Sequence, residues 1–149
     1  MSDCSDCKFG CGANQIKKEK TLIIIKPDAV RKKLIGEIIS RFEKAGFLIE
    51  KLKMMEVDKG LACSHYVEHE GRPYFDRLIN YVTSYRCVVM VVSRVDAIVK
   101  SRKLMGCTDS TKAEKGTIRG DYGEDITINV VHGSDSLKSA EREIKLFFG

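Results

Sequence analysis

The chain lacks any apolar run long enough to span a membrane, which takes about 20 consecutive residues. Its start, MSDCSDCKFGCGANQ, also lacks the apolar stretch of a secretory signal. These two absences predict a soluble, cytoplasmic protein that has reduced thiols and no membrane partner. The net charge of +5 is compatible with an anionic substrate, but it is too small to predict a specific nucleic-acid partner.

Several motifs that bind phosphate or metal in other enzymes are missing as well. The chain has no G-x-x-x-x-G-K-[ST], no G-x-G-x-x-G and no H-E-x-x-H segment. No pair of carboxylates stands at an obvious metal-ligand spacing. If the protein binds phosphate, it does so without a P-loop.

Three of the six cysteines, Cys4, Cys7 and Cys11, form a C-x2-C-x3-C pattern near the start. Structural zinc needs four ligands, and the nearest histidines, His65 and His69, stand far along the chain at i and i+4. They could supply a second half-site. We favour the simpler interpretation of incidental thiols in a polar tail and two solvent-facing histidines.

One catalytic domain is predicted over residues 21–149, after a polar tail over residues 1–20 that is disordered or extended. Runs of β-branched residues and period-two alternation predict strands, and apolar residues spaced by three and four predict helices. The strands are at 21–26, 47–57, 87–93 and 126–131, and the helices are at 35–45, 58–68, 75–82, 96–105 and 134–148.

This order reduces to βαββαβ once the helical pair after the second strand is set aside. It predicts the ferredoxin-like α+β sandwich, a four-stranded antiparallel sheet with helices on one face. The last helix begins with Ser134 or Asp135 as its cap, and Leu137 is expected to point inward with the other apolar residues of that helix.

Three cations stand at the ends of elements or near loops. Lys26 ends an apolar strand, Arg102 shares the apolar stripe of its helix, and Arg119 lies in the glycine-bounded segment GTIRGD. Each alone has an ordinary explanation, such as solvent exposure, a structural ion pair or a surface loop. Brought together by the fold, the three would form a clamp for phosphate.

The segment NVVHGSDS, residues 129–136, carries His132 out of an apolar strand. A neutral imidazole has a free lone pair near pH 7, so it can attack phosphorus without first losing a proton. Gly133 removes bulk beside it, and the helix that follows has an N-terminus that favours negative charge. The alternative is a structural histidine, but the neighbouring GSDS segment and the three cations favour a nucleophile.

Together, NVVHGSDS, GTIRGD and TLIIIKPDAV strongly resemble the signature segments of the nucleoside diphosphate kinases. The resemblance runs from about Thr21 to Phe148. It implies that His132 takes the γ-phosphoryl group of a nucleoside triphosphate, becomes a phosphohistidine, and passes the group to a nucleoside diphosphate.

The same resemblance implies roles for the other site residues. Glu143 orients the imidazole and is held by Ser134, while Tyr66 helps to position the transferring group. The implied nucleotide contacts are Lys26, Arg102, Arg119 and Thr108 for the phosphates, Asn129 and Lys26 for the ribose, and Tyr74, Leu78 and Ile126 for the base. The implied cofactor is Mg²⁺, held mainly by the phosphates and water.

The implied partners are nucleoside di- and triphosphates and further copies of the chain, as a hexamer first and a tetramer or dimer as alternatives. Four departures from the family pattern leave the assembly open. Tyr85 and Arg86 stand where the family usually has glycine and proline, and Ile128 replaces an arginine that is often found there. The loop over 106–116 is one residue short and lacks the family's prolines, and the chain stops at KLFFG without the C-terminal extension of many eukaryotic members.

Three other functions are compatible with parts of the sequence. An RNA-binding domain of this topology reads bases with aromatic residues on its central strands, and LIII and VVMVV carry none. A hydrolase that uses a phosphohistidine needs the same residues, so only the fate of the phosphate separates it from a kinase. A non-catalytic scaffold is disfavoured because the implied catalytic residues are all intact.

Overall fold

The computed structural model describes residues 17–149. The predicted tail up to residue 16, and with it the zinc hypothesis for Cys4, Cys7 and Cys11, lies outside the described residues. None of the helices in the described part is both long and apolar enough to cross a bilayer. The elements are β1 (Lys18–Ile25), α1 (Pro27–Arg31), α2 (Ile35–Lys44), β2 (Leu48–Glu56), α3 (Lys59–His65), η1 (Val67–His69), α4 (Phe75–Val82), β3 (Arg86–Val95), α5 (Ala97–Met105), η2 (Ser110–Lys112), α6 (Ile118–Tyr122), β4 (Val131–Gly133) and α7 (Leu137–Phe148).

In residues 17–149 the four strands form one sheet in the order β2-β3-β1-β4. Every neighbouring pair is antiparallel, and β1 pairs with β3 along its whole length, from Lys18 opposite Val95 to Ile25 opposite Val88. This is the ferredoxin-like arrangement, so the predicted fold class is confirmed.

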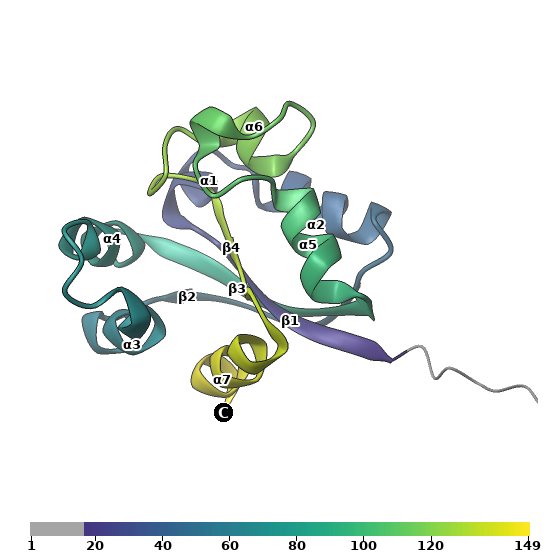
Figure 1. Cartoon of the computed structure of the whole chain (residues 1–149), viewed down its shortest axis with the longest axis horizontal. Helices are drawn as coiled ribbons and strands as arrows, with labels where there is room; N and C mark the ends of the chain where they lie inside the picture. The colour runs from purple at the N-terminus through teal and green to yellow at the C-terminus, as the bar shows by residue number, and fades with distance from the viewer. Residues whose placement is uncertain (1–16) are drawn as a thin grey trace, which may run out of the picture.

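Helices cover both faces of the sheet, so the expectation of helices on one face is wrong (Figure 1). The two crossover helices, α2 and α5, share one face with the short α1 and α6, while α3, α4 and α7 cover the other. Successive residues of β1 alternate between the two cores: Ile23 and Ile25 face one, and Leu22 and Ile24 face the other. An uninterrupted apolar strand is typical of a sheet that is buried on both faces.

The last strand differs most from its prediction. Only Val131–Gly133 pairs with β1, whereas the sequence predicts a strand over 126–131. The side chain of Asp125 accepts hydrogen bonds from the backbone N–H groups of Thr127 and Ile128, at 2.7 Å each. These bonds replace a strand ladder with a side-chain-held loop, because an aspartate side chain competes with the sheet for local N–H donors.

The ends of other elements differ in smaller ways. β1 begins at Lys18, within the predicted tail, and the short helices α1 and α6 are absent from the prediction. α7 is capped by Ser136, whose side chain accepts a bond from Ser139 N–H, and not by Ser134 or Asp135. Leu137, expected to point inward, lies on the first turn of α7 with 47% of its surface exposed.

Candidate active site

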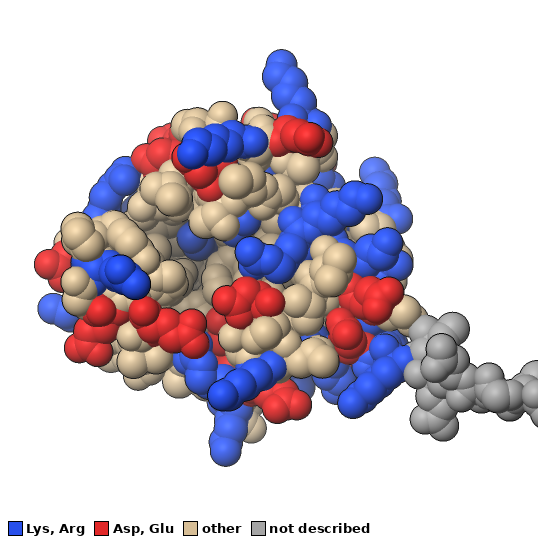
Figure 2. Space-filling view, viewed as in Figure 1, with Lys and Arg blue, Asp and Glu red and all other residues tan. Residues whose placement is uncertain are grey.

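A cavity of about 300 Å³ opens on one side of the molecule, beside the paired ends of β1 and β4. Figure 2 shows this hollow, with Lys and Arg side chains inside it and beside it. Of the twelve residues that the family resemblance selects, eleven line the cavity: Lys26, Tyr66, Tyr74, Leu78, Arg102, Thr108, Arg119, Ile126, Asn129, His132 and Glu143. The twelfth, Ser134, lies behind the cavity wall in contact with Glu143.

His132 lies within β4, opposite Ile24 of β1. Its side chain keeps 19% of its surface exposed, so it is accessible from the cavity and not sealed in the core. Burial, followed by the charges of Lys26 and Arg119, lowers the pKa of His132 well below its ordinary value. The imidazole is therefore neutral near pH 7 and keeps a free lone pair.

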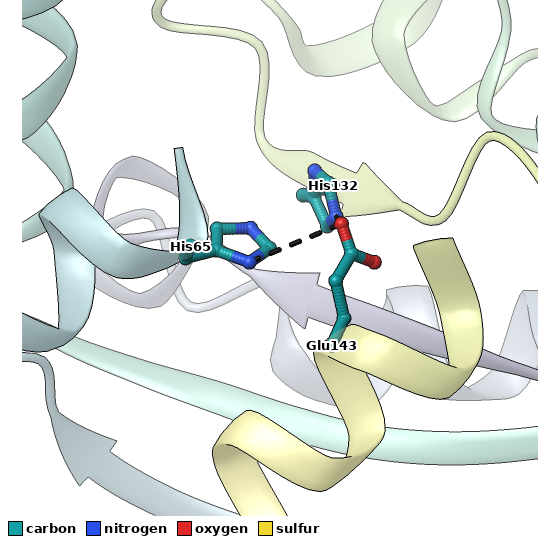
Figure 3. Close-up of side chains that lie close together, drawn as sticks. All are labelled: His65, His132 and Glu143. Atoms are coloured by element: carbon teal, nitrogen blue, oxygen red, sulfur yellow. Dashed lines mark hydrogen bonds and ion pairs between the residues drawn. The ribbon is translucent and has the colours of Figure 1, made fainter. Parts of the chain in front are cut away.

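Glu143 on α7 sets the orientation of the His132 ring. Its Oε1 lies 3.2 Å from His132 Nε2, while its Oε2 accepts a hydrogen bond from the Ser134 hydroxyl. Ser134 is in turn fixed to β1, because its Oγ accepts a bond from Leu22 N–H and its own N–H donates to Leu22 O, both at 3.2 Å. Figure 3 shows the other ring nitrogen, Nδ1, on the side away from Glu143.

His65 at the end of α3 is a site residue that the sequence analysis missed. It is only 4% exposed, so the expectation that it faces solvent is wrong. Its ring packs edge-to-face on the His132 ring with centroids 4.5 Å apart, and its Nδ1 lies 3.9 Å from Glu143 Oε1 (Figure 3). Burial, with the neighbouring His132, lowers the pKa of His65 to about 2, so this ring is also neutral. His69, its companion in the sequence, is half-buried.

Lys26 follows β1 and is only 4% exposed, so its cation does not emerge into bulk solvent. Its Nζ donates a hydrogen bond to Asn129 Oδ1 at 2.8 Å. Asn129 is fixed in turn, because its Nδ2 donates to the carbonyl oxygens of Thr108 (2.9 Å) and Ile126 (3.1 Å). Burial, with the positive charge of Arg119, lowers the pKa of Lys26 to about 7, against a smaller opposing effect of Asp28.

Arg119 is not a surface-loop arginine, because it is 5% exposed and lies on the short helix α6. Its Nη1 donates to Gly106 O and its Nη2 to Val131 O, both at 2.9 Å, so the guanidinium links the end of α5 to β4. Burial and the charge of Arg102 lower the pKa of Arg119 to about 10. Arg102 lies on the cavity wall and has an exposed surface, so it is not a core ion pair.

The backbone between Asn129 and His132 is strained. Val130, a buried β-branched residue, has a φ of +66°, and Val131 N–H donates to Asn129 O across it at 2.8 Å, which makes a γ-turn. The side chain of Asp28, itself buried, accepts a hydrogen bond from Val130 N–H at 3.2 Å and another from the Tyr81 hydroxyl. This turn aims Asn129 and His132 into the same cavity.

The far end of the cavity is more apolar and more open. Tyr74 and Ile126 are 43% and 59% exposed, while Leu78 is buried beside them. The Tyr74 hydroxyl lies 2.6 Å from His69 Nδ1, which holds the ring at the cavity rim. Nearer to His132, Tyr66 is 5% exposed, and burial raises the pKa of its hydroxyl.

Besides His65, the sequence reasoning missed Asp28, Val130 and Arg142. Arg142 lines the cavity, and its Nη2 lies 3.9 Å from Glu143 Oε1. A partial signal for Asp28 was its place in the KPDAV segment directly after a buried strand. Val130 left none, because a valine with a positive φ has no sequence signature.

The model of the family described as nucleoside diphosphate kinase matches residues 19–149 of the chain. A nucleoside diphosphate kinase of Pelotomaculum thermopropionicum is 54% identical over 130 residues, which covers 87% of each chain. That of Methanocaldococcus jannaschii is 52% identical over 131 residues, covering 88% of this chain and 94% of the relative.

Solved structures agree with this match. The nucleoside diphosphate kinase of Aquifex aeolicus superposes with a TM-score of 0.87 at 40% identity, covering 89% of this chain and 96% of that one. The Halobacterium salinarum enzyme, solved in complex with CDP, gives a TM-score of 0.86 at 46% identity and covers 89% and 88%. The chain therefore belongs to the nucleoside diphosphate kinases, phosphotransferases that move a phosphoryl group from a nucleoside triphosphate to a nucleoside diphosphate through a phosphohistidine.

Proposed function

We propose that His132 is the residue that carries the phosphoryl group in this chain. The observation that supports this best is the pairing of a neutral, cavity-facing ring with a carboxylate on one of its nitrogens. Because Glu143 occupies Nε2, the lone pair of Nδ1 is the one directed at an incoming γ-phosphorus. Attack by Nδ1 forms the N–P bond as the bond from phosphorus to the bridging oxygen of the nucleotide breaks, and a nucleoside diphosphate leaves.

The Ser134–Glu143–His132 chain of contacts supplies the positioning. As the ring becomes a phosphohistidine it gains positive character, and the Glu143 carboxylate stabilises it at Nε2. Ser134 keeps that carboxylate in one rotamer by binding its other oxygen. The second half-reaction reverses the first, with a different nucleoside diphosphate as the acceptor.

Lys26, Arg102 and Arg119 form the phosphate clamp in this proposal, and Thr108 adds a hydroxyl. Lys26 and Arg119 are buried before any nucleotide arrives, so their side chains are held in place in advance. A transition state of phosphoryl transfer spreads negative charge over the equatorial oxygens. Arg119 stabilises it as a fixed cation, and Lys26 does so in its protonated form. Asn129 is held by Thr108 and Ile126, so it presents its amide to the ribose from a rigid loop.

The base is expected to stack on Tyr74 at the open end of the cavity, against Leu78 and Ile126. Stacking on an exposed ring involves few base-specific hydrogen bonds, so the enzyme should accept several bases. Tyr66 lies deeper, where its unionised hydroxyl can donate to the transferring group.

The family uses Mg²⁺, and we propose that it reaches this chain with the nucleotide. In residues 17–149 the cluster of possible ligand groups is His65, His132 and Glu143, which is rich in nitrogen, whereas Mg²⁺ prefers oxygen ligands. Phosphate oxygens and water would therefore hold the ion, which neutralises charge on the phosphates while the chain's own cations bind and orient them.

We also propose that the chain forms a homo-oligomer, a hexamer first. β2 is an edge strand of the sheet, and it exposes Leu48, Leu52 and Met54 by half or more of their surfaces. An exposed edge with large apolar side chains is typical of a strand that pairs with a second copy.

A catalytic domain over residues 21–149 and a cytoplasmic location stay predictions.

The test is transfer of label from γ-labelled ATP in the absence of an acceptor. We expect a labelled protein that loses its label in acid and keeps it in base, and that is discharged by GDP, CDP or dGDP. His132→Ala should carry no label, and Lys32→Met serves as the control because it removes an exposed lysine that lies outside the cavity and pairs with Glu124. Stable labelling of His132→Ala, or release of the label mainly to water, would contradict the proposal and favour another nucleophile or a hydrolase.

A further inference from the structure

His65 makes no contact that explains its buried nitrogens. Its side chain is 1% exposed, and among residues 17–149 neither Nδ1 nor Nε2 has a hydrogen-bond partner. A buried polar group without a partner costs about 1–3 kcal/mol, so such groups call for an explanation. The ring is held by Tyr66, His132 and Phe147, each edge-to-face, which fixes its direction.

The polar groups that face this ring form a set suited to a metal ion. One ligand atom from each of His65, His132 and Glu143 lies within 4.8 Å of the other two (Figure 3). Two imidazoles and one carboxylate make up a common three-residue set for zinc, and they leave a fourth position for a water or a phosphate oxygen.

Two of the three ligand-to-ligand distances are close to those of a tetrahedral ion. Ligands at about 2.0–2.1 Å from Zn²⁺ lie about 3.3 Å from one another in a tetrahedron. His132 Nε2 and Glu143 Oε1 are 3.2 Å apart, while His65 Nδ1 and the same oxygen are 3.9 Å apart. A movement of about 0.6 Å at the end of the Glu143 side chain would close the second gap. The two ring nitrogens lie within 4.8 Å of each other, so the rings would also approach each other as the ion binds.

The surroundings support the same atoms as ligands. Ser134 binds Oε2 of Glu143 and leaves Oε1 turned toward the two rings, as hydrogen bonds behind a metal site usually do. Both rings are neutral and can therefore donate lone pairs. Lys26, Arg119 and Arg142 lie near the cluster and oppose a dication, so the affinity should be moderate and reversible.

We infer that His65, His132 and Glu143 form an inhibitory site for a nitrogen-preferring divalent cation, Zn²⁺ above all. Mg²⁺ does not compete well for such a set, because it prefers oxygen ligands in octahedral geometry. The ion takes Nε2 of His132 in the place of the contact with Glu143, and the proton of the neutral ring then lies on Nδ1. That proton occupies the nitrogen that would attack phosphorus. Binding needs only the three ligands, whereas the inhibition rests on the proposed role of His132.

The first experiment measures binding apart from activity. Isothermal titration of the full chain with Zn²⁺ should include one binding event that His65→Gln weakens by more than about tenfold and His69→Gln leaves unchanged. Because the chain also has six cysteines, Co²⁺ serves as an optical probe. The Co²⁺ bands present in the parent and missing in His65→Gln should be weak d–d bands. An intense sulfur-to-cobalt charge-transfer band among them would instead indicate cysteine ligands.

The second experiment measures phosphoenzyme formation from Mg²⁺–ATP. Zn²⁺ should slow labelling of the parent chain, a chelator should restore it, and the Zn²⁺ concentration for half-inhibition should rise more than about tenfold in His65→Gln. If His65→Gln folds poorly, Glu143→Asp is the second variant. It keeps a carboxylate but places it one methylene farther from the two rings, so it should also weaken Zn²⁺ binding. Titrations that are the same for the parent, His65→Gln and Glu143→Asp would overturn the site. If Zn²⁺ binding is lost in His65→Gln but Zn²⁺ does not inhibit the parent, the metal site stands and the proposed role of His132 is refuted.

Discussion

Lys26 should take up a proton when a nucleotide binds at pH 8. Burial and Arg119 lower its pKa to about 7 in the free protein. At pH 8, one unit above this value, only about one tenth of the molecules carry the charge. The same buried amine that helps to bind phosphate is thus mostly neutral before the phosphate arrives.

The phosphates should reverse this shift. A unit charge about 4 Å away stabilises an ammonium by about 4 kcal/mol at an effective dielectric constant of 20, which corresponds to about 3 pKa units. Nucleotide binding should therefore raise the pKa of Lys26 most of the way back to its ordinary value. The expected uptake is about 0.9 proton at pH 8 and about 0.1 proton at pH 6, where the amine is already charged.

The measurement is titration calorimetry with Mg²⁺–ADP in buffers of different ionisation enthalpy, because the slope of apparent enthalpy against that quantity gives the protons taken up. At pH 8 the phosphates of ADP are fully ionised and contribute little. Lys26→Met should abolish the uptake, whereas Lys32→Met, which removes an exposed lysine paired with Glu124, should not. An uptake below about 0.3 proton for the parent at pH 8 would show that Lys26 is already charged in the free protein.

Three further predictions concern the same region. The pKa of Lys26 is lower in the folded than in the unfolded chain, so the buried amine destabilises the fold most below pH 7 and less as the pH rises toward 10. Without nucleotide, Lys26→Met should therefore be about 1–3 kcal/mol more stable than the parent at pH 6. Urea unfolding should show a smaller difference at pH 9. Ser134→Ala should lower kcat about tenfold with little change in KM, and should cost about 1–3 kcal/mol of stability because Leu22 N–H loses a buried partner. Gly133→Ala should destabilise the fold by about 1–3 kcal/mol, since a Cβ there meets Met105 Cε at 2.4 Å. The melting temperature of the Gly133→Ala, Met105→Leu double variant should lie between those of Gly133→Ala and the parent.

The frame of this fold follows from local sequence patterns. The apolar runs at 21–26 and 87–93 lie in β1 and β3, which pair at the centre of the sheet, as continuous β-branched segments predict. The selection of cavity residues had a different source. Chemistry alone could favour Lys26, Arg102, Arg119 and His132, but only the family segments singled out Glu143 from Glu141.

What the sequence could not supply depends on contacts between distant segments. The strand predicted over 126–131 begins only at Val131, because Asp125 and Asp28 bind the N–H groups of the residues before it. Asp28 stands 102 residues away from Val130 along the chain. His65 was expected to face solvent because that was the simpler interpretation of His65 and His69 beside a zinc half-site. It is buried because α7 packs beside α3 and brings Phe147 and Glu143 onto it.

Buried polar atoms without a hydrogen-bond partner gather around the cavity of His132, where they lower the stability of the fold. Six buried side-chain atoms in residues 17–149 lack a hydrogen-bond partner, and four of them belong to His65, Tyr66 and Arg119, which all line the cavity around His132. Stability alone favours sequences in which every buried polar group has a hydrogen-bond partner. The gathering of unpartnered groups in one place therefore indicates a functional requirement. A ligand that supplies phosphate oxygens would satisfy the guanidinium and the tyrosine hydroxyl, whereas a nitrogen-preferring cation would satisfy the imidazole. The two ligands therefore complete different halves of the same set of unpartnered groups, and both should raise the melting temperature of the chain in proportion to their affinity for the folded state.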